Sequence, residues 1–155
     1  MNLDHIDLST GLDNREAFDA ALTKAVSKTR KANEPLSLLL IDVLNLESIY
    51  TQHGQATGED IVGAIGYIWK GAIRQSDSLA RVDTSLFAVI MPETSSKDGC
   101  NVAELLRKAI EHHVFVLGGK EMTCAVAIGV AGMLPDDADS TDIFSRAIQA
   151  LDQAK

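Results

Sequence analysis

The sequence has few of the residues that would indicate a disulfide framework, a fibre or a membrane protein. Its 155 residues include 2 cysteines and 3 prolines, and aromatic residues make up 5%. Cys100 and Cys124 lack C-x-x-C spacing, so we interpret both as reduced structural thiols, Cys100 at a helix start and Cys124 on a strand. No apolar run is long enough to span a membrane, and Met1–Thr10 lacks the apolar core of a secretory signal. These absences predict a cytoplasmic domain that does not insert into a membrane.

Basic residues are also scarce. The chain has 14 Lys and Arg against 22 Asp and Glu, a formal net charge of -8. The field of such a protein repels nucleic acid, so we expect no nucleic-acid partner, and any anionic ligand needs a local cationic site. The 46% apolar content and the length predict one globular domain over residues 1–155, which we expect to be part of a longer protein.

Apolar periodicity predicts an alternation of helices and strands. Helical spacing predicts helices over Asn14–Lys31, Glu59–Ile73, Asn101–His113 and Asp142–Lys155, with a polar turn at His53–Gly58 before the second. Short apolar runs predict strands over Leu36–Val43, Ser78–Arg81, Leu86–Met91 and Met122–Val130, the middle two forming a hairpin. This order predicts an α/β fold with a central mixed sheet flanked by helices.

Several short motifs follow one another along the chain. They are D-L-S-T-G-L-D-N-R at Asp7–Arg15, L-I-D-V at Leu40–Val43, the glycines Gly54 and Gly58, R-Q-S-D at Arg74–Asp77, I-G-V at Ile128–Val130 and the helical end at Ala147–Lys155. In this order they resemble the GGDEF family of diguanylate cyclase domains. The resemblance covers nearly the whole chain and implies a palm-like fold, similar to nucleotidyl cyclases, with a central sheet of about five strands.

The resemblance also implies a chemistry that the catalytic motif of this chain does not support. Family members condense two GTP molecules into cyclic di-GMP, with magnesium held by paired carboxylates in a transient dimer. Their hairpin motif G-G-D/E-E-F is replaced here by Asp83-Thr84-Ser85-Leu86-Phe87. Leu86 has no oxygen for a metal, and Ser85 replaces an acid. We therefore expect a vestigial Asp42, no functional Mg²⁺ site and no cyclase activity.

Other positions depart from the family pattern in the same direction. Tyr50 replaces a guanine-reading Asn, Gln55 a His, Leu44 an Asp and Glu47 a phosphate-facing Lys, whereas Glu59 keeps the charge of a guanine-reading Asp. For four further residues we favour structural roles: Asp42 as the acceptor of a backbone amide, Arg81 as a structural arginine, Trp69 as a core residue and Lys155 as a solvated charge.

The candidate binding site is the R-x-x-D motif, which the family uses as an inhibitory site for cyclic di-GMP. We place Arg74 and Asp77 on one face at a helix end, where the guanidinium can fork onto phosphate or guanine and the carboxylate can accept guanine N–H groups. Arg107 is our candidate for a second arginine arm. The same residues can also be an ordinary surface ion pair and an exposed helical arginine.

The leading hypothesis is a catalytically inactive GGDEF domain that serves as a cyclic di-GMP receptor and signals to a protein partner or fused signalling domain. One alternative is a protein-interaction module without nucleotide binding. Another is a residual diguanylate cyclase with an unusual metal site.

Overall fold

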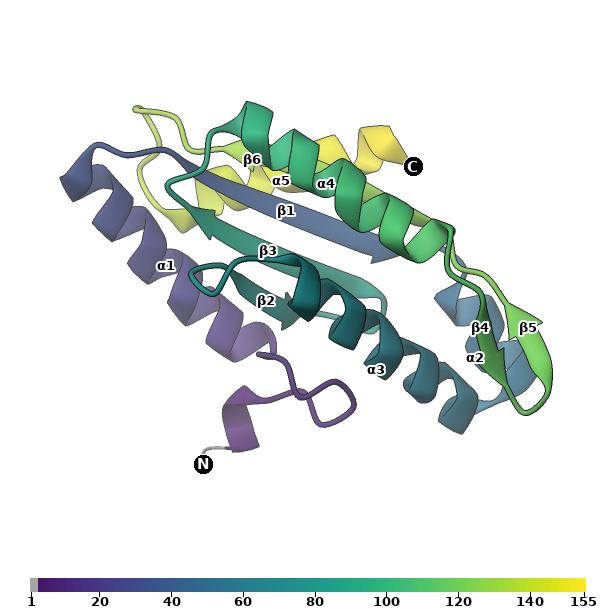
Figure 1. The fold of residues 1–155 in the computed structure, drawn as a ribbon. Helices are drawn as coiled ribbons and strands as arrows, with labels where there is room; N and C mark the ends of the chain where they lie inside the picture. The colour runs from purple at the N-terminus through teal and green to yellow at the C-terminus, as the bar shows by residue number, and fades with distance from the viewer. Residues whose placement is uncertain (1–2) are drawn as a thin grey trace.

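The computed structural model describes residues 3–155 and shows helices packed on both faces of a sheet (Figure 1). The helices are α1 (Arg15–Ala32), α2 (Leu46–His53), α3 (Gln55–Ala72), α4 (Ser96–Glu111) and α5 (Ser140–Ala154), after a short 3-10 helix at Leu3–His5. The strands are β1 (Leu36–Val43), β2 (Ser78–Arg81), β3 (Leu86–Pro92), β4 (Phe115–Leu117), β5 (Lys120–Met122) and β6 (Val126–Gly132). Residues 1 and 2 of the segment Met1–Thr10, for which we excluded a secretory signal, lie outside the described residues. The α/β class is confirmed.

The central sheet has four strands in the order β2-β3-β1-β6, and every ladder in it is antiparallel. The expectation of a mixed sheet of about five strands is corrected on both points, because β1 lies between β3 and β6 and both run opposite to it. Within residues 3–155 the one parallel pairing is a single bridge between Asp13 and Ala80 at the β2 edge. The strands β4 and β5 form a separate two-stranded sheet.

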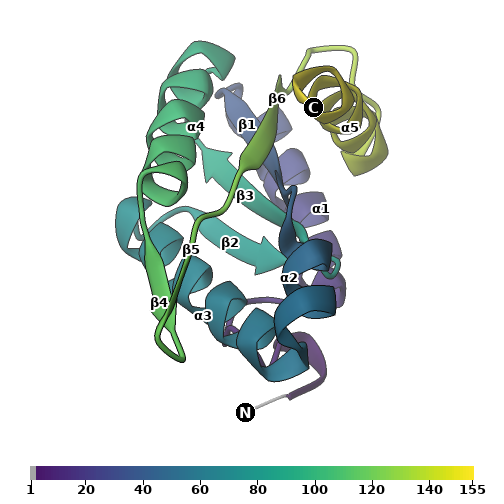
Figure 2. The same cartoon turned by 90° about the vertical axis from the view of Figure 1, so that its right-hand side faces the viewer.

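The buried strand β1 divides the apolar core into two halves. Leu39, Ile41 and Val43 belong to the half that α3 and α4 cover, whereas Leu38 and Leu40 belong to the half that α1 and α5 cover. This alternation follows from the two-residue period of a strand. Figure 2 shows the resulting layers, with α3 and α4 on one side of the sheet and α1 and α5 on the other.

The prediction of Trp69 as a core residue is confirmed. Its side chain is fully buried, its ring packs edge-on against Phe87, and its Nε1 donates to the Leu106 carbonyl at 3.0 Å. It therefore joins α3, β3 and α4.

Several helix boundaries differ from those expected because capping residues decide them. The helix α4 begins at Ser96, since the Ser95 side chain accepts the Asp98 N–H and caps it. The helix α3 begins at Gln55, directly after Gly54 with φ of 91°, so the expected polar turn is mostly helical. The eight-residue helix α2 was not predicted, because its two buried residues give too short an apolar pattern.

The expected strand Met122–Val130 is in fact two elements. Its first residue ends β5, and the central-sheet strand β6 begins at Val126. The hairpin of β4 and β5 turns at Gly118 and Gly119, which have φ of 59° and 78°, a pair of positive values that suits a tight hairpin turn. Cys124, expected on a strand, lies buried between β5 and β6, whereas Cys100 is exposed on α4.

Close packing of α5 on β6 positions the end of the chain. A Cβ at Gly129 would lie 2.2 Å from the backbone nitrogen of Leu151, so glycine is required for this approach. The helix α5 then ends beside the last residues of β1, and Lys155 reaches Asp42. Asp42, Ser85 and Lys155 are thus brought together by β1, the β2–β3 connection and α5.

Candidate functional site

Asp42 lies near the end of β1, opposite Leu86 in the β1–β3 ladder. Its Oδ1 accepts a hydrogen bond from the Ser85 hydroxyl at 2.8 Å, and its Oδ2 lies 3.0 Å from the Lys155 ammonium. The prediction that Asp42 accepts a backbone amide is therefore corrected, and Lys155, although exposed as predicted, pairs with Asp42. The two residues form an ion pair that the chain separation of 113 positions conceals in the sequence.

This arrangement does not fit a magnesium ion. Mg²⁺ is usually bound through one or two carboxylates together with substrate phosphates. Asp42 already faces the positive charge of Lys155, and Ser85 offers a neutral hydroxyl instead of a carboxylate. Leu86 packs against the core half that α1 and α5 cover, so it offers no oxygen. We derive no chemical step through a metal at these residues.

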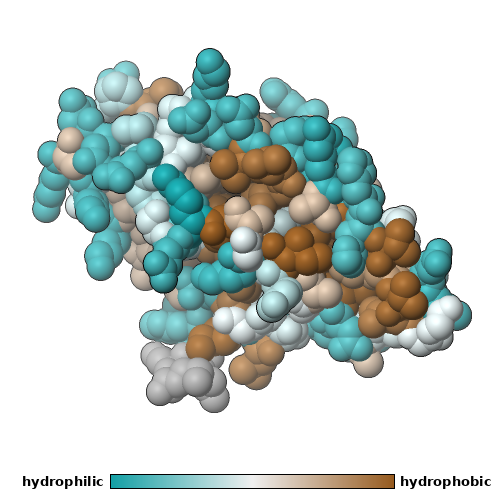
Figure 3. All heavy atoms as spheres, in the orientation of Figure 1, coloured by the Kyte–Doolittle hydropathy of each residue, from teal (hydrophilic) through white to brown (hydrophobic). Residues whose placement is uncertain are grey.

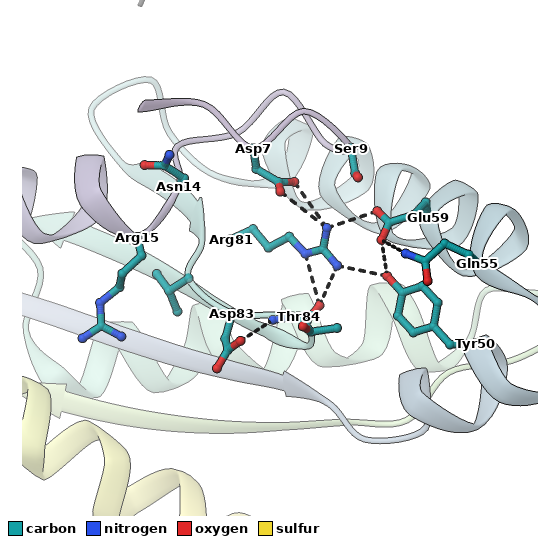
Figure 4. Close-up of a pocket in the computed structure, with 11 residues that line it drawn as sticks. Asp7, Ser9, Asn14, Arg15, Tyr50, Gln55, Glu59, Arg81, Asp83 and Thr84 are labelled. Atoms are coloured by element: carbon teal, nitrogen blue, oxygen red, sulfur yellow. Dashed lines mark hydrogen bonds and ion pairs between the residues drawn. The ribbon is translucent and has the colours of Figure 1, made fainter. Parts of the chain in front are cut away.

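Beside the β2–β3 connection, the buried Arg81 lies in the wall of the largest cleft described and bonds several of the other residues that line it (Figure 4). Arg81 is 8% exposed, and its guanidinium donates to the Thr84 carbonyl at 2.7 Å, to the Tyr50 hydroxyl at 3.1 Å and to Glu59 at 3.2 Å. It also lies 3.5 Å from Asp7. These contacts join the N-terminal segment, α2, α3 and the hairpin, in agreement with a structural role for Arg81.

The electrostatics of this network fix its charge state. Burial alone would lower the pKa of Arg81, but its hydrogen bond to Tyr50 and the charges of Asp7 and Glu59 together raise it. Burial alone would raise the pKa of Glu59, but hydrogen bonds from Ser9 and Tyr50 and the Arg81 charge lower it. Arg81 and Glu59 are therefore both ionised at neutral pH and serve as each other's partners.

The cleft has a volume of about 730 Å³, and Tyr50, Gln55 and Glu59 form part of its wall. The Tyr50 hydroxyl donates to Glu59 at 2.5 Å, and Gln55 donates to the same carboxylate oxygen at 3.3 Å. The Tyr50 ring lies over Gly58, where a Cβ would be 2.4 Å from a ring carbon. The charged groups that line the cleft are Asp7, Glu59, Asp83, Arg15 and Arg81. With three acids against two bases, the lining is unfavourable for a triphosphate.

Arg74 and Asp77 do contact one another, but in a turn after α3 and not on a helix face. The α3 helix ends at Ala72, and Asp77 folds back on the turn. Asp77 accepts the Arg74 backbone N–H at 2.9 Å, the Nε at 3.2 Å and the Nη2 at 2.8 Å. The Asp77 side chain is 0% exposed, whereas that of Arg74 is 51% exposed. Asp77 therefore positions Arg74 in this structure.

The Arg74 guanidinium is fixed from a second side as well. Its Nη2 donates to the Pro92 carbonyl at 2.9 Å and to the Thr94 hydroxyl at 2.7 Å. The hydrogen bond to Asp77 raises the pKa of Arg74, although partial burial opposes it. Among residues 3–155, none accepts a hydrogen bond from Nη1, and the Arg74 side chain is 51% exposed.

Arg107 lies elsewhere on the molecule. It bonds Glu104 and Glu111 on its own helix, and the hydrogen bond to Glu104 raises its pKa. It is eleven residues beyond the start of α4 at Ser96, which is about 16 Å along the helix axis. No hydrogen bond or pocket described for residues 3–155 joins it to Arg74, so its part in a shared site stays a prediction.

The sequence analysis identified most residues of this region but not the side chains with which they form hydrogen bonds. Tyr50 and Glu59 were identified as family positions, but their bond to each other and to Arg81 joins two helices and a strand. Ser85 was identified as the replacement of an acid, but its hydrogen bond to Asp42 was not. Such pairs leave no periodic signal in one sequence.

None of the helices in residues 3–155 is long and apolar enough to cross a membrane. Within the same residues, no group of three or more His, Cys, Asp or Glu side chains is arranged to hold a metal ion.

Known proteins share both this sequence pattern and this fold. Residues 4–155 match the family model described as "Diguanylate cyclase, GGDEF domain". The chain is 28% identical over 152 residues to diguanylate cyclase A of Treponema denticola, covering 96% of this chain and 41% of that protein. It thus spans less than half the length of this relative.

Solved structures agree. The FimX GGDEF domain of Pseudomonas aeruginosa is 27% identical with a TM-score of 0.92, covering 97% of this chain and 93% of that chain. The GGDEF domain of DgcB from Caulobacter crescentus, crystallised in complex with c-di-GMP, is 20% identical with a TM-score of 0.93, covering 99% of this chain and 88% of that one. With a family model matched over nearly its whole length, the chain belongs to the GGDEF domain family of diguanylate cyclases.

Proposed function

We propose that this domain binds cyclic di-GMP without making it and passes the binding signal to a protein partner. The observation that carries the proposal is the state of Arg74. Its guanidinium is half exposed, is held from two sides by Asp77, Pro92 and Thr94, and keeps Nη1 free of partners among residues 3–155. A fixed arginine fork suits phosphate and guanine acceptors, because little side-chain entropy is lost when a ligand binds.

The ligand assignment rests on the membership of the chain in the GGDEF family and on the resemblance of Arg74 and Asp77 to the family's inhibitory motif. The DgcB GGDEF domain was crystallised with c-di-GMP, although at 20% identity it supports the fold alone. In an acidic domain of formal net charge -8, a dianionic dinucleotide needs a local cation such as Arg74. In this proposal Arg74 contacts the ligand, and the buried Asp77 is a positioning residue.

The absence of cyclase activity is supported by the environment of Asp42. Its two carboxylate oxygens are engaged by Ser85 and Lys155, and the facing residue in the ladder is Leu86. Incubation with GTP and Mg²⁺ or Mn²⁺, followed by chromatography, is expected to give no cyclic di-GMP. Product formation that Asp42→Ala abolishes would contradict this part of the proposal.

The receptor role is tested by calorimetric titration with cyclic di-GMP. Arg74→Ala is expected to weaken binding by about 10-fold or more, since a charge-assisted hydrogen bond contributes roughly 1.5–3 kcal/mol. Arg15→Ala is the matched control, because Arg15 is also a half-exposed arginine in an ion pair, with Asp19. The variant Arg107→Ala tests whether Arg107 contributes a second arginine to the cyclic di-GMP site. Fluorescence of the single tryptophan checks that each variant is folded.

A second candidate is an interaction module that binds no nucleotide, and one observation favours it. Apolar side chains gather over the face formed by α3 and α4 (Figure 3). On these helices Tyr67 is 83% exposed and Leu105 is 67% exposed, and large exposed apolar side chains often mark protein-interaction surfaces. If folded wild-type protein gives no binding heat at high micromolar cyclic di-GMP, the receptor proposal fails and this alternative replaces it.

A further inference from the structure

The connection between β3 and α4 has an unusual backbone conformation at Glu93. Its φ is 53°, and within residues 3–155 Asn33 is the other non-glycine residue with positive φ. A side chain makes this left-handed conformation unfavourable, so it persists where contacts hold the chain on both sides. Figure 1 shows this connection and the turn after α3 at the same end of the sheet, beyond the tip of β3. The turn contains Arg74, and the connection contains Thr94.

Thr94 contacts Arg74 from this connection. It is 4% exposed, and its hydroxyl accepts a hydrogen bond from Arg74 Nη2 at 2.7 Å and donates to the Pro92 carbonyl at 2.9 Å. Because a threonine hydroxyl has one hydrogen, donation to Pro92 leaves only its lone pairs for Arg74. The hydroxyl is therefore oriented as an acceptor for the guanidinium.

Thr94 acts on a different hydrogen of the guanidinium from those that Asp77 engages. Asp77 accepts from Nε at 3.2 Å and from Nη2 at 2.8 Å, which is the bidentate edge of the fork. Nη2 carries a second hydrogen, for which Thr94 and the Pro92 carbonyl are the acceptors. Thr94 is also neutral, so it holds the guanidinium without cancelling the positive charge that an anionic ligand needs.

Thr94 is tied in turn to the central sheet. Ser37 on β1 is fully buried, and its hydroxyl donates to the Thr94 carbonyl at 2.8 Å. A Cβ at Gly99 would lie 3.2 Å from the Ser37 Oγ, so α4 packs closely over this bond. The next residue, Ser95, caps α4. The backbone at Thr94 therefore cannot shift without breaking a buried hydrogen bond or disturbing the start of α4.

We propose that Thr94 is a positioning residue of the cyclic di-GMP site, and that its hydroxyl sets the direction of the Arg74 guanidinium relative to the sheet. The inference rests on the proposed function, in which Arg74 contacts the ligand. Asp77 lies in the same turn as Arg74, so the pair can move together with that turn, whereas Thr94 links the guanidinium to β1 through Ser37. An arginine held in place in this way loses less entropy when a ligand binds.

A purely structural role for Thr94 makes a different prediction. Thr94→Val keeps the branched shape and removes the hydroxyl. The Pro92 carbonyl still accepts from Arg74, and both Nη2 hydrogens keep an acceptor, so no buried polar group loses its only partner. We therefore expect its urea unfolding midpoint to lie close to that of Thr29→Val, a control at the other buried threonine of residues 3–155. A purely structural residue would lose stability and affinity together.

The first measurement uses the free domain. NMR signals of the Arg74 guanidinium, assigned by their loss in Arg74→Lys, report the exchange of its protons with water. We expect Thr94→Val to speed this exchange by about threefold or more, and Thr94→Ser, which restores a hydroxyl, to return it to the wild-type rate. Thr94→Ala replaces Thr94→Val if the valine variant does not fold. Because no ligand is needed, this measurement decides on positioning even if wild-type protein does not bind cyclic di-GMP and the proposed function fails.

Calorimetric titration with cyclic di-GMP is the second measurement. We expect Thr94→Val to weaken binding by about fivefold, and Thr94→Ser and Thr29→Val to stay within about twofold of wild type. In an Arg74→Ala background, Thr94→Val should cause no further loss, because it acts through Arg74. An equal loss in both backgrounds overturns the proposal. Unchanged Arg74 exchange in Thr94→Val, or a failure of Thr94→Ser to restore it, overturns it as well.

Discussion

Removal of the Asp77 carboxylate should destabilise the domain far more than removal of a matched exposed carboxylate. Asp77 is fully buried and accepts three hydrogen bonds from Arg74, one from the backbone and two from the guanidinium. Breaking a buried pair typically costs about 3–5 kcal/mol. Because the Arg74 side chain is 51% exposed and can regain water, we expect Asp77→Ala to lower the free energy of unfolding by about 2–3 kcal/mol.

Asp19→Ala is the control for this prediction. Asp19 also pairs with an arginine, Arg15, but the two side chains are 58% and 51% exposed, so its loss should cost no more than about 0.5 kcal/mol. Urea unfolding followed by Trp69 fluorescence measures both values, since Trp69 is the single tryptophan and is buried. If Asp77→Ala were within about 0.5 kcal/mol of Asp19→Ala, the argument that Asp77 positions Arg74 would be refuted.

Two further predictions concern titratable groups. In the folded protein a thiol reagent should modify Cys100 rapidly and Cys124 only after unfolding in urea, because Cys124 is buried and its pKa is raised to about 11; equal rates in native protein would contradict the fold around it. The hydrogen bond from Arg146 lowers the pKa of Asp137 below its usual 3.8, so this pair stabilises the folded state above that pH and less as the pH falls through the lowered pKa. The Asp137→Asn variant should therefore be less stable than wild type at pH 7. The difference between the urea unfolding midpoints of the two proteins should become smaller below about pH 4.

Much of the fold could be predicted from local patterns. The β1 strand spans Leu36–Val43 as expected, because a continuous apolar run of strand length fits a strand buried on both faces. The hairpin strands β2 and β3 also agree closely with the prediction. The short helix α2 and the hairpin of β4 and β5 were missed because each contributes few apolar residues, although the Gly118–Gly119 pair was a usable turn signal.

The candidate site was likewise predictable from the sequence only in part. The sequence predicted that Leu86 and Ser85 replace acids, since residue identity decides which side chains can offer an oxygen. It did not show that Lys155 neutralises Asp42, because α5 brings the end of the chain to β1. Nor did it show that Asp77 is buried under Arg74, because the end of α3 at Ala72 turns a supposed helix face into a tight turn.

By itself, then, the sequence determined the family and the α/β class, because the order of the motifs and the apolar periodicity can be read from the chain alone. The tertiary structure decided the partners: which charge faces Asp42, and which nitrogens of the Arg74 guanidinium have acceptors within the described residues. The physical reason is that hydrogen bonds and ion pairs depend on distances of a few ångströms between residues far apart in sequence, and packing alone fixes those distances.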